Sequence, residues 1–167
     1  MATTADLVPL VVIGGSAGAL TPLKTIIRGL PTELPAAICV VIHLPDNSPS
    51  ELARLLGRAG SLRAVFAKDG AGLEAGTVSV APPGNHLLIE DGRVRLSPGA
   101  RENGSRPAID PLFRTAARTH GSRVISVVLS GTLDDGSAGT VAVRRSGGVA
   151  LVQEPDEAIS NTSVIGC

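Results

Sequence analysis

The sequence predicts an α/β fold, a three-layer doubly wound domain with a mostly parallel sheet and a small antiparallel hairpin region. Short runs rich in β-branched residues alternate with longer segments of helical periodicity, which is the pattern of strand–helix–strand units. Several of these runs are apolar at nearly every position, as expected for strands buried on both faces of a parallel sheet. Hydrophobic residues make up 43% of the 167 residues and charged residues 18%, so the chain can bury one sizeable core.

The first half of the chain contains three expected strands separated by two helices. The strands cover residues 7–13, 36–42 and 62–66. A helix that starts at Ala17 and runs to about Gly29 follows the first strand, and a second helix carries the leucines near residue 55.

The middle of the chain lacks this alternation of strands and helices. Residues 77–81, 86–89 and 94–96 are short expected strands, and Asp91-Gly92 between the last two is a strong signal for a two-residue hairpin turn. We therefore expect a meander or an antiparallel edge here, carried on the parallel sheet.

The last third returns to alternating strands and helices. A helix is expected from Pro107 to near Gly121, followed by a strand at 124–129, a helix at 137–146 and a strand at 149–152. No linker divides these elements, so we expect a single domain over residues 1–167.

Composition argues against several classes of partner. Phe66 and Phe113 are the only aromatic residues, which leaves no platform on which nucleic acid bases could stack. Fifteen basic residues balance fifteen acidic ones, so the net charge favours neither nucleic acid nor an anionic membrane. Neither a signal peptide nor an apolar run long enough to span a bilayer is evident, and Cys39 resembles a small buried hydrophobe. We expect a cytoplasmic protein without membrane insertion.

Three polar residues directly follow apolar strands. Ser16, His43 and Asp135 are far apart in the sequence, but the carboxyl ends of parallel strands meet at one rim of the sheet. A serine needs an imidazole to accept its proton, and the imidazole needs a carboxylate to orient it. The spacing Gly14-x-Ser16-x-Gly18 also fits a turn that exposes a nucleophile, and a helix starting at Ala17 would direct N–H groups toward an oxyanion.

Each of these signals has a plainer interpretation. The glycine-rich turn could hold a phosphate or present an N-cap serine. His43 could be a strand-end histidine bonded to backbone, and Asp135 competes with Asp134, either of which could cap the next helix. From the residues alone, the triad is one hypothesis among these.

Five motifs resemble those of a known family and occur in the family's order. They are VVIGGSAGA at 11–19, VIHLP at 41–45, APPGNHLL at 81–88, RPAIDPLF at 106–113 and LSGTLDDG at 129–136. Together they resemble the catalytic domains of chemotaxis protein-glutamate methylesterases, the CheB type, from about residue 8 to about residue 158.

The resemblance implies a serine esterase that removes methyl esters from glutamates on chemoreceptor cytoplasmic helices, with some relatives also deamidating glutamines. It implies Ser16 as nucleophile, His43 as general base and Asp135 as the orienting acid, with backbone N–H groups at Ala17 and Thr132 holding the oxyanion. Neither a metal nor a cofactor is implied, whereas a methyltransferase or a separate regulator is a further expected partner. The resemblance covers the catalytic domain alone, without a receiver domain, and we expect the C-terminal end to fall short of the full family domain.

The sequence departs from the family motifs at two of the positions expected to matter, and it is compatible with two other functions. Ala17 stands where many relatives carry threonine, and Thr132 where many carry methionine. The rivals are a serine esterase or amidase acting on another substrate, and a non-catalytic module that binds a ligand or a partner. His86 could line the site or pack the central loop, whereas Asp110 is expected to make structural hydrogen bonds in the first turn of its helix.

Overall fold

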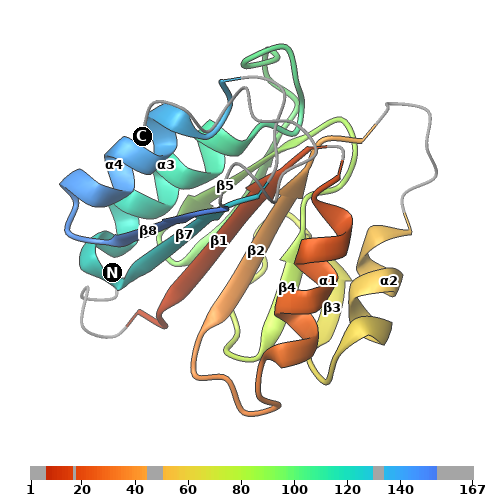
Figure 1. Ribbon diagram of the computed structural model, residues 1–167. Coiled ribbons are helices and arrows are strands. Elements are labelled where there is room, and N and C mark those ends of the chain that lie inside the picture. The colour runs from red at the N-terminus through yellow and green to blue at the C-terminus, as the bar shows by residue number, and fades with distance from the viewer. Residues whose placement is uncertain (1–6, 17, 45–50, 130–133, 154–167) are drawn as a thin grey trace.

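Six parallel strands form the central sheet of the computed structural model, which describes residues 7–16, 18–44, 51–129 and 134–153. Their order across the sheet is β3-β4-β2-β1-β7-β8 (Figure 1). The strands are β1 (Leu10–Gly15), β2 (Ala37–Ile42), β3 (Arg63–Phe66), β4 (Thr77–Val80), β7 (Val124–Val128) and β8 (Val149–Val152). All six residues of β2 are buried, which explains the unbroken apolar run in the sequence.

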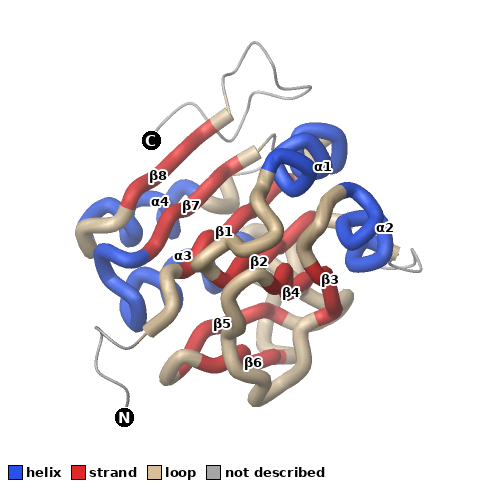
Figure 2. The backbone as a smooth tube through the Cα atoms, turned by 90° about the horizontal axis from the view of Figure 1, so that it is seen from below, coloured by secondary structure: helices blue, strands red, loops and turns tan. Residues whose placement is uncertain are grey.

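Four helices cover the two faces of this sheet. Helices α1 (Leu20–Gly29) and α2 (Leu52–Ala59) lie on one face, and α3 (Ile109–His120) and α4 (Ser137–Arg145) lie on the other (Figures 1 and 2). The predicted three-layer doubly wound fold is thereby confirmed. None of the helices in the described part of the chain is both long enough and apolar enough to cross a membrane.

The antiparallel region differs from the expected meander on the parallel sheet. Strands β5 (His86–Glu90) and β6 (Arg93–Ser97) form a separate two-stranded sheet, joined at Asp91-Gly92 as predicted. This hairpin packs against α3, where the Ile89 N–H donates to Thr115 Oγ1 at 3.0 Å. Residues 77–80 instead enter the main sheet as β4, parallel to both neighbours. Because β3 and β2 occupy both edges of β4, that strand has no edge left for a hairpin.

Two predicted helix starts are also corrected. Helix α1 begins at Leu20 rather than Ala17, because Gly18 adopts a φ of 90°, which an α-helix does not accommodate. Helix α3 begins at Ile109 rather than Pro107, because Ala108 has extended backbone dihedrals. Both turns before these helices lie at the rim where the sheet's strands end.

The core has one layer on each face of the sheet. Side chains of β1 and β2 alternate between the layers, so that Val12 and Cys39 face α3 whereas Ile13 and Val40 face α1 and α2. Burial raises the pKa of the Cys39 thiol to about 12, so this residue behaves as the small buried hydrophobe that the sequence indicated.

Strand β1 is the point at which the direction of winding changes. The chain moves from β1 to β2 on one side, then returns to place β7 and β8 on the other side. In an open parallel sheet, such a switch point leaves a crevice at the carboxyl ends of the central strands. Ser16 follows β1 at that position.

Helices α3 and α4 approach each other closely at Gly139. A Cβ atom on Gly139 would collide with the Cβ of Phe113 and would lie 3.1 Å from Asp110 Oδ1. The close approach of the two helices therefore depends on the absence of a side chain at this position.

We predict that Gly139→Ala lowers the free energy of unfolding by about 1–3 kcal/mol, because the added methyl group overpacks a buried helix contact. Urea denaturation measures the change. Gly29→Ala is the matched control, since a Cβ on this helical glycine meets nothing within 4 Å and should be neutral or stabilising. Equal stability of the Gly139 variant and the wild type would contradict the packing described here.

Candidate active site

Ser16 and His43 occupy equivalent positions on neighbouring strands. Gly15 of β1 pairs in register with Ile42 of β2, and each candidate residue is the next one along its strand. The His43 N–H donates to the Gly15 carbonyl at 2.9 Å, which continues the parallel ladder to this point. Adjacent parallel strands lie about 4.8 Å apart, so the register sets Ser16 beside His43 at the rim. Ser16 is buried, with 5% of its surface exposed.

The third candidate, Asp135, comes from the loop after β7, on the far side of β1. Its Oδ2 lies 2.7 Å from His43 Nε2. The Asp135 side chain is 1% exposed, whereas that of His43 is 16% exposed. Asp134, the competing carboxylate, is exposed, and its carbonyl accepts from the Ser137 N–H at 3.2 Å. The carboxylate that faces the imidazole is therefore that of Asp135.

Among the described residues, four hydrogen-bond donors contact the Asp135 carboxylate, two on each oxygen. Oδ2 accepts from His43 Nε2–H at 2.7 Å and from the Ile109 N–H at 2.6 Å. Oδ1 accepts from the Asp110 N–H and the Asn103 side-chain amide, both at 2.9 Å. Two of these donors are the first N–H groups of α3, so the charge also meets the positive end of the helix dipole.

These donors decide the ionisation of Asp135. Burial alone acts most strongly and would raise the pKa of the carboxyl group. The hydrogen bonds from His43, from the two α3 amides and from Asn103 together outweigh burial and hold the pKa below its ordinary value of 3.8. An ionised carboxylate can only accept, so the proton between the two side chains sits on His43 Nε2. Nδ1 is then the basic nitrogen of the neutral imidazole ring.

An acid, an imidazole and a buried serine hydroxyl at one rim are the types of group that acyl transfer requires. Within the described ranges, His, Cys, Asp and Glu side chains form no group of three or more that could hold a metal ion. The sequence profile of CheB methylesterases matches residues 11–162, which is most of the chain. The chain belongs to the CheB methylesterase family.

Individual relatives agree with this family membership. A curated relative from Leptospira interrogans is 40% identical over 146 residues, covering 87% of this chain and 76% of its own length. Protein-glutamate methylesterase/protein-glutamine glutaminase 2 of Anaeromyxobacter dehalogenans is 40% identical over 153 residues, covering 92% of this chain and 44% of its own. The crystal structure of the Thermotoga maritima CheB methylesterase catalytic domain matches with a TM-score of 0.88 at 34% identity, covering 94% of this chain and 87% of that one.

The structure describes only some of the remaining candidate residues of this CheB family member. Ala17 and Thr132, expected to hold the oxyanion, lie outside the described residues. His86 is 3% exposed; its Nδ1 accepts from the Ala108 N–H at 3.2 Å, and its Nε2–H donates to the Ala100 carbonyl at 2.8 Å. With both ring nitrogens bonded to backbone, His86 has the loop-packing role that was one of its two predicted alternatives.

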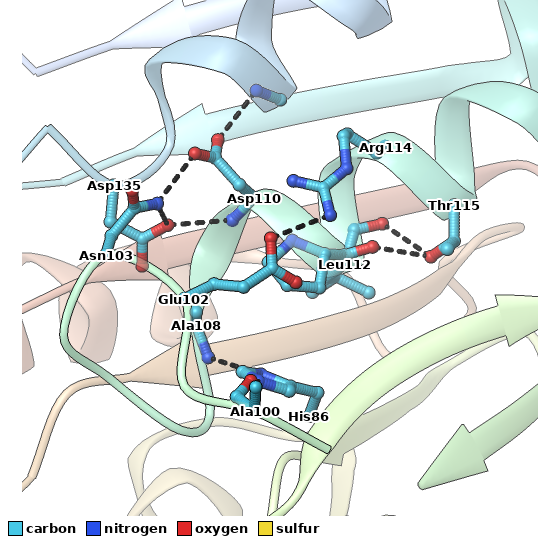
Figure 3. A network of polar contacts seen from close by, with 12 residues as sticks. His86, Ala100, Glu102, Asn103, Ala108, Asp110, Leu112, Arg114, Thr115 and Asp135 are labelled. Carbon is cyan, nitrogen blue, oxygen red and sulfur yellow. Dashed lines mark hydrogen bonds and ion pairs between the residues drawn. The ribbon is translucent and has the colours of Figure 1, made fainter. Parts of the chain in front are cut away.

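Asp110 makes structural hydrogen bonds, as expected, but its partners lie outside its own helix. Its Oδ1 accepts from the N–H groups of Gly136 and Gly139 at 3.0 and 2.7 Å, at the start of α4. Its Oδ2 accepts from Asn103 Nδ2 at 2.8 Å (Figure 3). Asn103 is not among the residues predicted for the site, although the dipeptide Asn103-Gly104 is a recognisable turn signal in the sequence.

We predict that acid destabilises this protein partly through Asp135. Because the folded-state pKa lies below 3.8, the stabilisation from the carboxylate is complete above that pH and is lost as the pH falls through the folded value. Urea unfolding at about pH 6 and about pH 3 should show a smaller change for Asp135→Asn than for wild type, since the amide does not titrate. An equal change in the two proteins would contradict this account.

Proposed function

We propose that the chain is a protein-glutamate methylesterase in which Ser16, His43 and Asp135 act as nucleophile, general base and orienting acid. The observation that carries the proposal is the 2.7 Å contact between His43 Nε2 and the buried, ionised Asp135. This contact fixes the ring beside Ser16, which follows the neighbouring strand at the same register. Hydrolytic chemistry is in keeping with the family to which the chain belongs.

The acylation step follows from this arrangement. His43 Nδ1 accepts the hydroxyl proton as Ser16 Oγ attacks the glutamyl ester carbonyl. Asp135 holds the resulting imidazolium by its hydrogen bond to Nε2 and by its charge. Collapse of the tetrahedral intermediate breaks the bond to the methoxy group, and His43 returns the proton so that methanol leaves. The glutamyl group remains esterified to Ser16.

Water completes the cycle by the same route. His43 removes a proton from a water molecule, the hydroxide attacks the acyl-enzyme, and the proton passes to Ser16 Oγ as the free glutamate leaves. We assign the oxyanion to the backbone N–H groups of Ala17 and Thr132, as the family resemblance implies. Such donors contribute most where the negative charge develops.

The substrate class is inferred from the relatives. We propose methylated glutamates on the cytoplasmic helices of chemoreceptors, which places the reaction in the cytoplasm. The name of the Anaeromyxobacter relative also includes protein-glutamine glutaminase, and an acyl-enzyme mechanism accommodates deamidation because ammonia can replace methanol as the leaving group.

The decisive variant is Ser16→Ala. It should lower methanol release from methylated receptor fragments by roughly 10⁴- to 10⁶-fold, because it removes the nucleophile and leaves binding intact. Release is measured enzymatically over time, and circular dichroism verifies that both proteins are folded. Ser122→Ala is the matched control, since this exposed serine lies in the short 3₁₀ turn before β7 and should leave the rate unchanged.

A fluorophosphonate probe separates the rival functions. Labelling of Ser16 without action on methylated receptor fragments would favour a serine esterase or amidase with another substrate. Methanol release at the wild-type rate from Ser16→Ala would overturn the assignment of the nucleophile. A folded wild-type protein that neither reacts with the probe nor releases methanol would favour the non-catalytic module.

A further inference from the structure

Asn103 lies at the tip of a tight turn between β6 and α3. Its flanking residues exchange two backbone hydrogen bonds, from the Glu102 N–H to the Ser105 carbonyl at 3.0 Å and from the Ser105 N–H to the Glu102 carbonyl at 2.9 Å. Asn103 and Gly104 have φ values of 52° and 77°, as in a type I′ turn. Asparagine adopts this left-handed conformation more readily than most residues, so the turn directs its side chain in a defined direction.

The side-chain amide of Asn103 joins two buried carboxylates. Its Nδ2 donates to Asp110 Oδ2 at 2.8 Å and to Asp135 Oδ1 at 2.9 Å, so one nitrogen uses both of its protons on two acids (Figure 3). Asp135 and Asp110 are 2% and 4% exposed, respectively, although Asn103 itself lies at the exposed tip of the turn. The amide is thus a neutral donor placed between two like charges.

We propose that Asn103 is a positioning residue for the reaction, which holds the Asp135 carboxylate in the orientation that fixes His43. This inference rests on the proposed triad. Asn103 touches neither Ser16 nor the reacting ester in this scheme, and it acts through Asp135 alone.

The other donors do not make Asn103 redundant. The Ile109 and Asp110 amides come from the backbone of α3 and the imidazole from the residue after β2, so they hold Asp135 from two directions. Asn103 supplies the second hydrogen bond on Oδ1, the oxygen that does not face His43. Without it, this oxygen keeps the Asp110 N–H and loses the amide that separates it from the Asp110 carboxylate. Repulsion between the two acids would then favour rotation of Asp135 and a higher pKa.

The loop that carries Asn103 is fastened at both ends. His86 bonds to Ala100 on one side of the turn and to Ala108 on the other. The Arg106 guanidinium donates from Nη1 to the carbonyls of Pro98 and Gly99 at 3.0 and 2.9 Å. These contacts connect strand β5 to the loop and set the position of the Asn103 amide.

A second turn in the chain offers a matched control. Asp91 and Gly92, between β5 and β6, have φ values of 49° and 73°, nearly the same as those of Asn103 and Gly104. Asp91 is exposed and bonds to neither acid of the site. Glycine at the first turn position retains the left-handed conformation in both places. Asn103→Gly and Asp91→Gly therefore have similar backbone effects, and only the first removes the bridging amide.

The experiment compares wild type, Asn103→Gly, Asn103→Asp and Asp91→Gly by two readouts. Methanol release from methylated receptor fragments should show kcat reduced roughly 10- to 100-fold in Asn103→Gly with KM unchanged, because the base is misaligned rather than the substrate. The kcat of Asn103→Asp should fall further, since this substitution places a third carboxylate where the amide donor was. Asp91→Gly should keep the wild-type kcat.

NMR of the protein without substrate gives the second readout. The carboxyl carbon of Asp135 should titrate at a higher pH in both Asn103 variants, and the downfield Nε2 proton of His43 should broaden or shift. Unchanged Asp135 titration, His43 proton and kcat in folded Asn103→Gly would overturn the proposal. The proposal would also be overturned if Asp91→Gly lost as much activity as Asn103→Gly, because the loss would then be an effect of turn flexibility.

These readouts separate this proposal from the proposed function. A wild-type protein with no methanol release would refute the esterase assignment, yet the Asp135 titration and the His43 proton would still decide whether Asn103 positions the acid. Conversely, an active wild type with an Asn103→Gly variant that is indistinguishable from it by NMR and by kcat would leave the esterase standing and remove Asn103 from its machinery.

Discussion

The site depends on the contact between the Asp135 carboxylate and the N–H groups at the start of α3. A buried carboxylate is destabilising unless its oxygens accept hydrogen bonds, and within the described part of the chain four donors from three separate parts of the fold supply them. Two of those donors are helix N–H groups that would otherwise lack partners. The same contact therefore caps α3 and orients His43 at the end of β2.

Asp110 repeats this arrangement in the opposite direction. It lies in the first turn of α3 and accepts from the N–H groups of Gly136 and Gly139 at the start of α4, whereas Asp135 precedes α4 and accepts from α3. Asp110 of α3 thus caps the start of α4, and Asp135, which precedes α4, caps the start of α3. Gly139 allows this exchange, because a side chain there would meet both Phe113 and Asp110. The packing of α3 against α4 and the positions of Asp110 and Asp135 are therefore coupled, so that a change in one alters the other.

The sequence was sufficient to place Ser16, His43 and Asp135 at one rim, because residues that end apolar strands converge wherever the sheet is parallel. It was not sufficient to place β4, since a four-residue strand has the same apolar pattern in a meander as between two parallel neighbours. It also left open which ring nitrogen of His43 faces the acid. Asn103 could not be predicted as a site residue, because its proposed role depends on contacts with Asp110 of α3 and Asp135, and no local sequence pattern encodes such long-range contacts.

The donors around Asp135 also determine where the proton resides during the reaction that we propose. Hydrogen bonds that stabilise the carboxylate reduce its basicity, so a proton taken from Ser16 stays on His43 and does not move on to the acid. A carboxylate held only by the imidazole would be more basic and freer to rotate. Neutral donors from α3 and Asn103 leave the full negative charge beside His43 while fixing its direction. Asp135 is therefore held in one orientation and stays ionised, although burial alone would favour its neutral form.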